Sequence, residues 1–358
     1  MNIGIFSDSY FPLINGVTTS LSTLAKQLEN LGHTVYIFAP DAPDLPHEND
    51  KIIRMPSMPC AFVKNARLGI LYSPMELAKI SVLNLDIIHT QTEFPLGICG
   101  KILSKTLNIP MVHTYHTMYE DYVHYIVNGA LITPAMAKEY SKVFCNYANA
   151  VIAPTQKVQG LLRQYGVTKH IEVIPTGINI DHFRKANYSE EEILDIKKSI
   201  GIENNNHIVL SLGRVAKEKS IDVIIKAFPK LIEKLPDAKL VIVGDGPVRD
   251  DLEKLAKDLQ ITNHVIFTGA KPYSQIGKYY QLGNVFASAS VTETQGLTFA
   301  EAMAAGIPVV AKKDPSIEGI VTDRETGFLF NNDDEVADKL YEVLSNSSLQ
   351  EKTAQKAM

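Results

Sequence analysis

NVFASASVTETQGLTFAEAMAAGIPVVAK, residues 284–312, contains two short apolar segments with an alanine-rich segment between them. The segments 284–290 and 307–312 are rich in apolar and β-branched residues and predict strands. The alanines between them predict a helix that starts near Leu297 or Thr298. Nearly continuous apolar strands joined by a helix are typical of a parallel sheet that is covered on both faces. We therefore expect an α/β fold.

The same alternation runs through the whole chain. The predicted strands of the first half are residues 2–7, 34–39, 86–91, 110–115, 150–155 and 171–176, and those of the second half are 207–213, 238–245, 264–270, 284–290 and 307–312. A helix with one apolar face follows the first strand and ends at Gly32. The length of 358 residues suits two domains at roughly 100–200 residues each.

We therefore predict two Rossmann-like, doubly wound parallel-sheet domains. The first covers residues 1–178 and the second covers 207–345, with a polar linker region at 179–206. A helix is expected at 346–358, and the chain ends inside this helical pattern, which leaves open a missing C-terminal piece. Ligands of such sheets bind beyond the carboxyl ends of the strands, so we expect a site in a cleft between two facing domains.

Composition and charge exclude several classes of protein. The chain is 45% hydrophobic and has 35 basic against 40 acidic residues, with the acidic excess in its second half. It lacks a basic stripe of the kind that binds nucleic acid, and it lacks the apolar runs of a membrane helix or a signal peptide. Its three cysteines are far apart, which predicts buried apolar residues rather than disulfides or zinc ligands. We expect a cytoplasmic location.

Several common catalytic motifs are absent. The sequence has no GxxxxGK[ST] phosphate loop and no GxGxxG after a predicted strand. It also lacks HExxH, GxSxG and the set of kinase motifs. These absences disfavour a nicotinamide-linked enzyme, a zinc protease, a serine hydrolase and a kinase.

The segment LSLGRVAKEKS, residues 210–220, places two basic residues directly after a predicted strand. Arg214 offers a planar fork for phosphate oxygens, and Lys219 offers a point charge. Together they would bind a diphosphate and stabilise it as a leaving group. A solvated basic loop beside the next helix explains the same residues equally well.

The segment TETQGLTFAEAMAAG, residues 292–306, has two carboxylates around a glycine. Gly296 lets the backbone approach a ligand, and the N–H groups of Leu297 and Thr298 would then face an anion at the start of a helix. Glu301 lies where a carboxylate can accept hydrogen bonds from a ribose diol, and Glu293 lies where it can hold sugar hydroxyls. The alternative is that Glu301 complements the helix N-terminus and Glu293 is merely exposed.

Taken together, these segments resemble retaining glycosyltransferase family 4. ETQGLTFAE matches the E-x7-E motif of that family, and GRVAKEKS matches its G-R-x-x-x-E-K-G motif, with Ser220 in place of the usual glycine. VIVGDGPVRDDLE and VIFTGAKP resemble the nucleotide-side loops, which implies that Gly244, Asp245 and Gly269 bind the donor. A further departure is the pair Thr294-Gln295 before the glycine. The resemblance covers residues 1 to about 345 and implies a GT-B fold.

The first half also resembles this family. In FPLINGVTTS, Gly16 would bring the backbone to the donor diphosphate at the start of a helix beginning at Val17. An ordinary turn capped by Asn15 or Thr18 is the alternative. In VHTYHTMYEDYVHY, residues 112–125, His116 corresponds to the histidine that contacts the transferred sugar. The alternative of a metal site has no carboxylate–histidine spacing to support it.

Two further segments bear on the acceptor. Tyr115, Tyr119, Tyr122 and Tyr125 would form one face of a helix, either as core or as an acceptor-side surface near lipid. HTMYEDYVHY resembles the diacylglycerol glucosyltransferases of this family. Residues 58–80 combine apolar residues with Lys64, Arg67 and Lys79, which is typical of a helix on an anionic membrane or of one packed on the sheet.

The resemblance implies a retaining α-glycosyltransferase that moves glucose from UDP-glucose to diacylglycerol at the inner membrane surface. It implies no cofactor and no metal, and it assigns catalysis to His116, Arg214, Lys219 and Glu293. Three alternatives remain open. They are another donor and acceptor, such as GDP-mannose and phosphatidylinositol, a non-catalytic protein that binds nucleotide sugar or lipid, and a phosphorylase-like or nicotinamide-linked enzyme.

Overall fold

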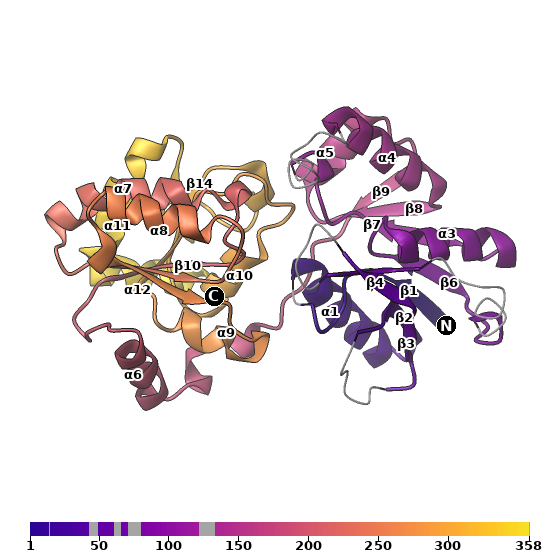
Figure 1. Cartoon of the computed structure of the whole chain (residues 1–358), viewed down its shortest axis with the longest axis horizontal. Coiled ribbons are helices and arrows are strands. Elements are labelled where there is room, and N and C mark those ends of the chain that lie inside the picture. Colours follow the sequence, from indigo (N-terminus) through magenta and orange to yellow (C-terminus); the bar gives the residue numbers. More distant parts are fainter. Residues whose placement is uncertain (14, 43–48, 61–65, 71–79, 122–132, 358) are drawn as a thin grey trace. The chain divides into compact units, whose positions relative to one another are not determined.

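The computed structural model describes residues 1–13, 15–42, 49–60, 66–70, 80–121 and 133–357. The chain divides into two compact units, Met1–Ile178 and Asn179–Met358, which we call unit 1 and unit 2. Each unit is built around one parallel sheet (Figure 1). The predicted α/β class is therefore confirmed in both halves of the chain.

Unit 1 contains a parallel sheet, sheet A, with the strand order β3-β2-β1-β6-β7-β8-β9 among its described residues. Its strands are β1 (Asn2–Phe6), β2 (Thr34–Pro40), β3 (Ile52–Met55), β6 (Ile87–Thr90), β7 (Met111–Thr114), β8 (Ala150–Ala153) and β9 (His170–Val173). A separate antiparallel pair joins β4 (Ser57–Pro59) to β5 (Arg67–Gly69). All six predicted strands of this half are present, whereas β3, β4 and β5 were not predicted.

The helices of unit 1 cover both faces of sheet A. Among the described residues of this unit they are α1 (Gly16–Asn30), α3 (Pro95–Leu107), α4 (Pro134–Tyr147) and α5 (Gln156–Tyr165). Helices α3, α4 and α5 connect β6 to β7, β7 to β8 and β8 to β9, so all three crossovers run in the same direction along the sheet. Because such parallel crossovers are right-handed, the three helices lie on one face (Figure 1). Helix α1 connects β1 to β2, in the opposite direction along the sheet, and therefore lies on the other face. Each face has its own apolar core. Gly32 has φ +85 just after α1, as expected of a terminating glycine.

A buried carboxylate joins three segments of unit 1. Asp8, in the loop after β1, accepts hydrogen bonds from the backbone N–H of Gly69 at 2.9 Å and of Leu96 at 3.0 Å. The hydroxyl of Thr92 also donates to it, at 3.0 Å. Helix α3 has Phe94 at its N-cap and no side-chain cap of its own, so Asp8 satisfies a free N–H group of its first turn from the loop after β1.

Unit 2 contains sheet C, another parallel sheet, with the described strand order β12-β11-β10-β13-β14-β15. Its strands are β10 (Ile208–Leu212), β11 (Lys239–Val243), β12 (Val265–Gly269), β13 (Val285–Ser288), β14 (Val309–Lys312) and β15 (Gly327–Phe330). The five predicted strands of this half are present. The sixth, β15, was not predicted and extends the sheet beside β14.

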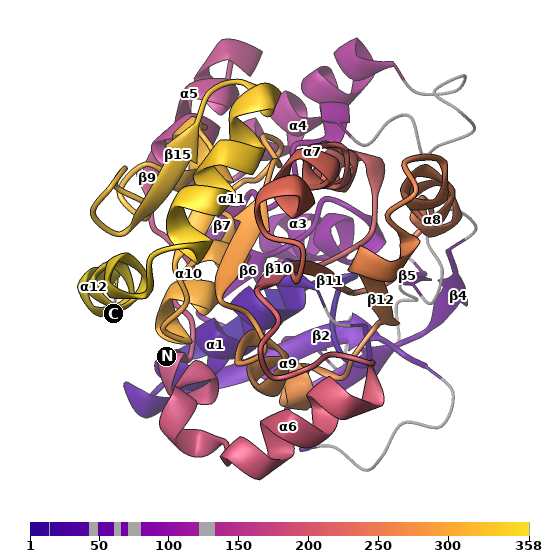
Figure 2. The same cartoon turned by 90° about the vertical axis from the view of Figure 1, so that its left-hand side faces the viewer.

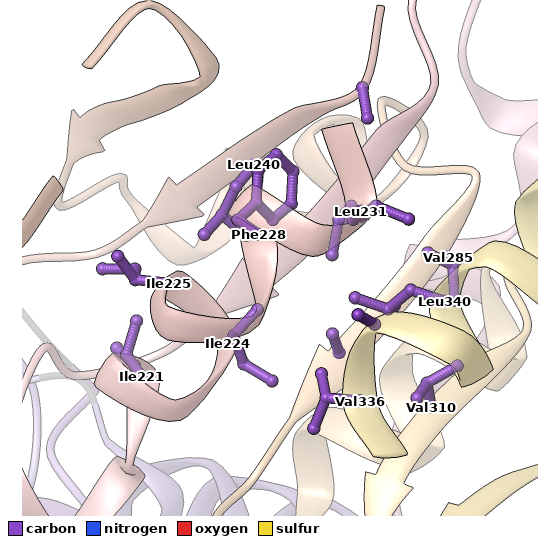
Figure 3. Packing of buried hydrophobic residues seen from close by; sticks show 14 of the residues in the cluster. Ile221, Ile224, Ile225, Phe228, Leu231, Leu240, Val285, Val310, Val336 and Leu340 are labelled. Atoms are coloured by element: carbon purple, nitrogen blue, oxygen red, sulfur yellow. The ribbon is translucent and has the colours of Figure 1, made fainter. Parts of the chain in front are cut away.

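The helices of unit 2 also lie on both faces of its sheet. They are α6 (Glu190–Ser199), α7 (Ile221–Lys234), α8 (Arg249–Asp258), α9 (Tyr273–Tyr280), α10 (Leu297–Ala304), α11 (Val336–Leu344) and α12 (Ser347–Ala357). On one face, α7, α8 and α11 enclose an apolar core in which Phe228 of α7 lies beside Leu240 of β11 (Figure 3). Full burial of a side chain of this size stabilises the fold by about 1.5–3 kcal/mol.

The opposite face of sheet C is covered by α9 and α10. Helix α6 lies beside α9 in both views (Figures 1 and 2). Residues 179–206, expected as a linker, contain α6 and the short 3-10 helices η4 (Ile180–Phe183) and η5 (Lys185–Asn187). Phe183 of η4 is fully buried among residues of α9 and α10. Elsewhere in the described parts of the chain, the 3-10 helices are η1 (Tyr119–Asp121), η6 (Lys217–Lys219), η7 (Thr262–His264), η8 (Pro315–Ile317) and η9 (Asp333–Glu335).

Candidate active site

Backbone hydrogen bonds join the loops at the carboxyl edge of sheet C. The N–H of Gly213 donates to the carbonyl of Val243 at 3.0 Å, and that of Gly244 donates to Gly269 at 3.1 Å. The N–H of Val215 donates to the carbonyl of Asp245 at 3.0 Å. The loops after β10, β11 and β12 therefore form one connected surface where parallel sheets bind their ligands.

The glycines of this surface permit close approach between loops. Gly244 has φ +147, and a Cβ there would lie 1.8 Å from the carbonyl oxygen of Gly213. Gly269 has φ +75, in the left-handed region that favours glycine. These contacts give Gly244 and Gly269 a structural reason to be glycine. Donor binding by Gly244, Asp245 and Gly269 stays a prediction.

Lys219 and Glu293 form an ion pair with 2.6 Å between Nζ and Oε1. Lys219 ends η6, in the loop after β10, and Glu293 lies in the loop after β13. The hydroxyls of Ser290 and Thr292 both donate to the carbonyl of Glu218, at 3.2 and 3.0 Å. The structure therefore brings together two predicted catalytic residues that lie far apart in the sequence, and side-chain to backbone bonds hold their loops in place.

Arg214 has a carboxylate partner that the sequence reasoning did not assign. Its Nη1 lies 3.8 Å from Oε1 of Glu218, whose side chain is only 3% exposed. A buried carboxylate beside a guanidinium restricts where the exposed cation can lie. The signal was available, because Glu218 is the glutamate of the G-R-x-x-x-E-K-G match.

Helix α10 begins at Leu297, where the sequence predicted it. Its N-cap is Gly296, which has φ +68 and ψ 56 and provides no side-chain cap. A Cβ at Gly296 would also lie 2.5 Å from Cδ2 of Phe299, so glycine is required here on two grounds. The N-terminus that carries Leu297 and Thr298 suits an anion, which is the role predicted for it.

Glu301 is buried in the second turn of α10. Its Oε2 accepts a hydrogen bond from the hydroxyl of Tyr280, on α9, at 2.8 Å. Burial raises the pKa of Glu301 to about 7, and the Tyr280 hydrogen bond opposes this rise. Glu301 is therefore not a solvated surface carboxylate, and its predicted contact to ribose remains untested. Tyr280 was not singled out from the sequence.

Ser220, the departure from the family motif, adopts a glycine-like conformation. It has φ 49 and ψ 37, at the N-terminus of α7, and its side chain makes no cap hydrogen bond. The turn after Lys219 is thus maintained, at the steric cost that a Cβ imposes in the left-handed region.

We expect Ser220→Gly to raise the free energy of unfolding by about 0.5–1 kcal/mol, because relief of the left-handed strain exceeds the added freedom of the unfolded chain. Urea denaturation measures this change. Ser199→Gly, in the last turn of α6, is the matched control and should be destabilising. A Ser220→Gly protein as unstable as the control would contradict the strain.

At the start of α1 in unit 1, the structure shows a side-chain cap. Asn15 is the N-cap, and its Oδ1 accepts the N–H of Thr18 at 3.0 Å. The hydroxyl of Ser9 bonds the same side chain. Helix α1 begins at Gly16, one residue before the predicted start at Val17. The alternative of an Asn15-capped turn is therefore present, and donor binding by Gly16 stays a prediction.

His116 follows β7 and is partly buried. Its Nε2 lies 2.6 Å from Oε1 of Gln91, the residue after β6. Burial, with smaller effects of His113 and His89, lowers the pKa of His116 to about 3. The imidazole is therefore neutral near pH 7, so it can act on a sugar through hydrogen bonds and not through positive charge.

A buried polar network next to His116 was also missed. Oε1 of Glu93 lies 3.0 Å from Nε2 of His113, and both side chains are almost fully buried. The hydroxyl of Tyr119 donates to the Glu93 carboxylate, and that of Tyr140 donates to the Glu93 carbonyl. This network connects the segments after β6 and β7 to α4.

The prediction that the tyrosines of residues 115–125 form one face of a helix is wrong for Tyr115 and Tyr119. Tyr115 directly follows β7, and its N–H donates to the carbonyl of Ile152 in β8 at 3.0 Å. Its side chain is fully buried and bonds the hydroxyl of Ser141 at 3.0 Å. Tyr119 begins η1 and packs edge-on against Tyr115. The alternative that they are core residues holds for these two, while Tyr122 and Tyr125 lie outside the described residues.

Part of the segment 58–80 lies in the antiparallel pair of β4 and β5, so the helix expected there is wrong for those residues. The guanidinium of Arg67 donates to the hydroxyl and carbonyl of Ser57 at 2.7 and 2.8 Å, and lies 3.5 Å from Asp41. Arg67 thus supports the local fold. Lys64 and Lys79 lie outside the described residues.

Neither metal clusters nor spanning helices occur in the part of the chain that the structure describes. No three His, Cys, Asp or Glu residues stand close enough there to hold a metal ion. No described helix is long and apolar enough to cross a membrane.

Solved structures with the same fold support the two-unit architecture. The Anabaena protein HepE in complex with UDP and glucose superimposes with a TM-score of 0.78 at 20% identity, covering 100% of this chain and 93% of that one. Sucrose-phosphate synthase of Thermosynechococcus elongatus superimposes with a TM-score of 0.79 at 20% identity, covering 99% of this chain and 92% of that one. At this identity, the likeness establishes the fold alone.

Sequence comparison establishes the family. The family described as Glycosyltransferase Family 4 matches residues 14–182, and Glycosyl transferases group 1 matches 192–358. An alpha-monoglucosyldiacylglycerol synthase of Streptococcus pneumoniae is 40% identical over 96% of this chain and 78% of the relative. One of Acholeplasma laidlawii is 36% identical over 98% and 89%. The resemblance read from the motifs is confirmed: the chain belongs to glycosyltransferase family 4 and is a glycosyltransferase of GT-B fold.

Proposed function

We propose that this enzyme transfers glucose from UDP-glucose to diacylglycerol with retention of the anomeric configuration. The observation that carries the proposal is the ion pair between Lys219 and Glu293 at the carboxyl edge of sheet C. Glu293 lies three residues before Gly296, the N-cap of α10. The donor and acceptor are suggested by the two alpha-monoglucosyldiacylglycerol synthases that align with nearly the whole chain.

The diphosphate is held by cations and a helix end. Arg214 and Lys219 supply positive charge, and the N–H groups of Leu297 and Thr298 supply hydrogen bonds at the positive end of α10. Negative charge grows on the diphosphate as the bond from sugar C1 to the phosphate oxygen breaks. Groups placed beforehand around that charge stabilise the transition state more than the ground state.

The remaining roles concern the sugar and the ribose. When the donor binds, Lys219 turns from Glu293 toward the diphosphate, and Glu293 accepts hydrogen bonds from sugar hydroxyls. Glu301 accepts hydrogen bonds from the ribose diol. The neutral His116, by its ring or its carbonyl, contacts the transferred sugar.

The chemistry needs no protein nucleophile. The acceptor hydroxyl attacks C1 on the face that the phosphate leaves, so one C–O bond forms as another breaks. The departing phosphate oxygen takes the proton of the acceptor hydroxyl. We propose that the reaction uses no metal and no organic cofactor, and unchanged turnover in EDTA is the expected result.

A transfer assay tests the proposal. Purified protein is given radiolabelled UDP-glucose and dioleoylglycerol in vesicles that contain phosphatidylglycerol, with labelled GDP-mannose as the parallel donor. We expect lipid-extractable counts from UDP-glucose, in a product that an α-glucosidase cleaves. Counts from GDP-mannose alone would overturn the donor, and a product resistant to α-glucosidase would overturn retention.

We further propose that the enzyme works on the inner, anionic surface of the cell membrane. The face of unit 1 formed by α3, α4 and α5 is basic, with Glu139 as the acidic residue of these helices. Its basic residues are Lys101, Lys105, Lys138, Lys142, Lys157 and Arg163. Met136 and Val143 of α4 are 55% and 53% exposed on the same helix. Basic and apolar side chains together suit an anionic lipid surface.

Combined replacement of Lys105, Met136 and Val143 by serine should weaken binding to phosphatidylglycerol vesicles by about tenfold at low salt, because it removes charge and inserted apolar surface. Vesicle co-sedimentation measures this. The matched control changes Lys26 and Leu31 to serine at α1 on the opposite face, where Leu31 is 74% exposed. Equal binding by the two variants would contradict this membrane face.

A further inference from the structure

Tyr280 is a fully buried tyrosine whose hydroxyl points at a predicted binding residue. It ends α9, and its hydroxyl donates to Oε2 of Glu301 at 2.8 Å and lies 3.3 Å from the carbonyl oxygen of Thr298. Both partners belong to the first two turns of α10. One hydroxyl therefore contacts the predicted ribose carboxylate and the helix end predicted to face the diphosphate.

Aromatic packing fixes the ring of Tyr280. Phe183 packs edge-on against it with 5.5 Å between ring centroids, and Phe286 of β13 lies 6.0 Å away. These contacts do not involve the hydroxyl. Phenylalanine at this position would keep the packing and remove only the hydrogen bond, so the role of the hydroxyl can be tested separately.

We propose that Tyr280 is a positioning residue that holds Glu301 as a carboxylate for the nucleotide ribose, so that donor binding releases a proton. The proposal rests on the proposed function, in which Glu301 binds the ribose diol. A buried carboxylate with few partners is readily protonated, and a protonated carboxyl accepts hydrogen bonds poorly. A hydrogen bond from a permanent donor favours the charged form.

The tyrosine is such a permanent donor. Burial and the neighbouring Glu301 raise the pKa of Tyr280 well above its ordinary value, so its hydroxyl keeps its proton. Burial raises the pKa of Glu301 to about 7, which places its titration near neutral pH. Below that pH the free protein carries more neutral Glu301, and affinity for the ribose should fall.

Apart from Tyr273, the other titratable groups around α10 are engaged elsewhere or exposed. Tyr273 of α9 interacts electrostatically with Glu301, whereas His182 of η4 bonds the carbonyl of Tyr273 at 2.9 Å. The remaining charged residues on the elements packed against α10 are Asp181 paired with Arg184, Lys278 paired with Glu192, Lys312 paired with Asp333, and the exposed Glu351, Lys352 and Lys356.

The test is the affinity for UDP-glucose from pH 5.5 to 8.5, measured by calorimetry. UDP-glucose is suitable because its diphosphate has no group that titrates in this range. For wild type we expect affinity to fall up to about tenfold per pH unit below pH 7, with proton release on binding in buffers of different ionisation enthalpy. Glu301→Gln should flatten this profile.

Tyr280→Phe should move the midpoint of the profile upward by about one pH unit, because a hydrogen bond to a charged group is lost. Its affinity should be about fivefold weaker than that of wild type at pH 7, approach tenfold weaker at pH 5.5, and recover toward wild type at pH 8.5. Tyr279→Phe, at the neighbouring position of α9, is the matched control and should follow wild type. Recovery at high pH separates proton control from a merely structural loss.

Three results would overturn the inference. They are a Tyr280→Phe profile that superimposes on wild type, one that is weaker by the same factor at every pH, and a wild type without proton release. The measurement of proton release uses the wild-type protein, so it tests the inference even if Tyr280→Phe does not fold. The Glu301→Gln variant separates a failure of this inference from a failure of the proposed function. If its affinity for UDP-glucose equals that of wild type at every pH, the assignment of Glu301 to the ribose fails as well.

Discussion

Replacement of Lys219 by alanine is expected to lower turnover by a factor of about 10²–10³, the usual loss when one preorganised group facing a developing charge is removed. Lys219 Nζ lies 2.6 Å from Glu293, and this ion pair keeps the cation at the carboxyl edge of sheet C, from where we propose that it turns to the diphosphate. The alanine variant loses that cation and leaves Glu293 without this partner, which repels the diphosphate further. Steady-state transfer of glucose to diacylglycerol measures the effect.

The control for this experiment lies in the same 3-10 turn. Lys217 is exposed, two residues before Lys219, and Lys217→Ala removes the same charge from η6. Its turnover should stay within about twofold of wild type, because exposed charges contribute little at physiological salt. Similar losses in both variants would show that general basicity, and not the position of Lys219, supports the reaction.

Gly244→Ala is expected to lower the free energy of unfolding by about 3 kcal/mol, a large share of the stability of an ordinary domain. The new Cβ would lie 1.8 Å from the carbonyl oxygen of Gly213, which is backbone and cannot rotate away. The residue also has φ +147, a conformation that alanine rarely adopts. Urea denaturation followed by far-ultraviolet circular dichroism measures the loss.

Gly160→Ala is the matched control for this substitution. Gly160 lies inside α5, and a Cβ there would meet no atom within 4 Å. Alanine should be neutral or stabilise unit 1 by up to about 1 kcal/mol, because it favours a helix over glycine. If Gly244→Ala unfolds at the wild-type midpoint, the loops after β10 and β11 are not held as close as the structure places them.

The sequence predicted the strands of both sheets well because burial on two faces requires nearly continuous apolar runs. The strands that it did not reveal are short or interrupted. β3 is four residues long and is followed by Pro56, and β15 begins with Gly327. Such edge strands depend on the neighbour that they pair with, here β2 and β14.

For the candidate site, the sequence predicted which residues are functional, but it did not predict which of them contact one another. The motifs indicated Lys219 and Glu293 as functional, but their ion pair joins loops 74 residues apart and depends on how the strands align. Glu218 was visible in a motif, yet its burial was not. Tyr280 carries no local signal, since a tyrosine at the end of a helix is usually core. The spacing of the tyrosines at 115–125 matches helical periodicity, but the segment begins directly after β7 and residues 115–118 are not helical, so the prediction from spacing was wrong there.

The carboxylate of Asp8 has a consequence for the order of folding. Helix α3 lacks a side-chain cap of its own, and the group that satisfies its Leu96 N–H comes from a residue 88 positions earlier in the chain. The first turn of α3 therefore gains its cap only after β1 has paired with β6 and brought the loop after β1 into place. This contact couples the last step of helix formation to a long-range sheet contact, so the N-terminal half of unit 1 should assemble cooperatively and not helix by helix.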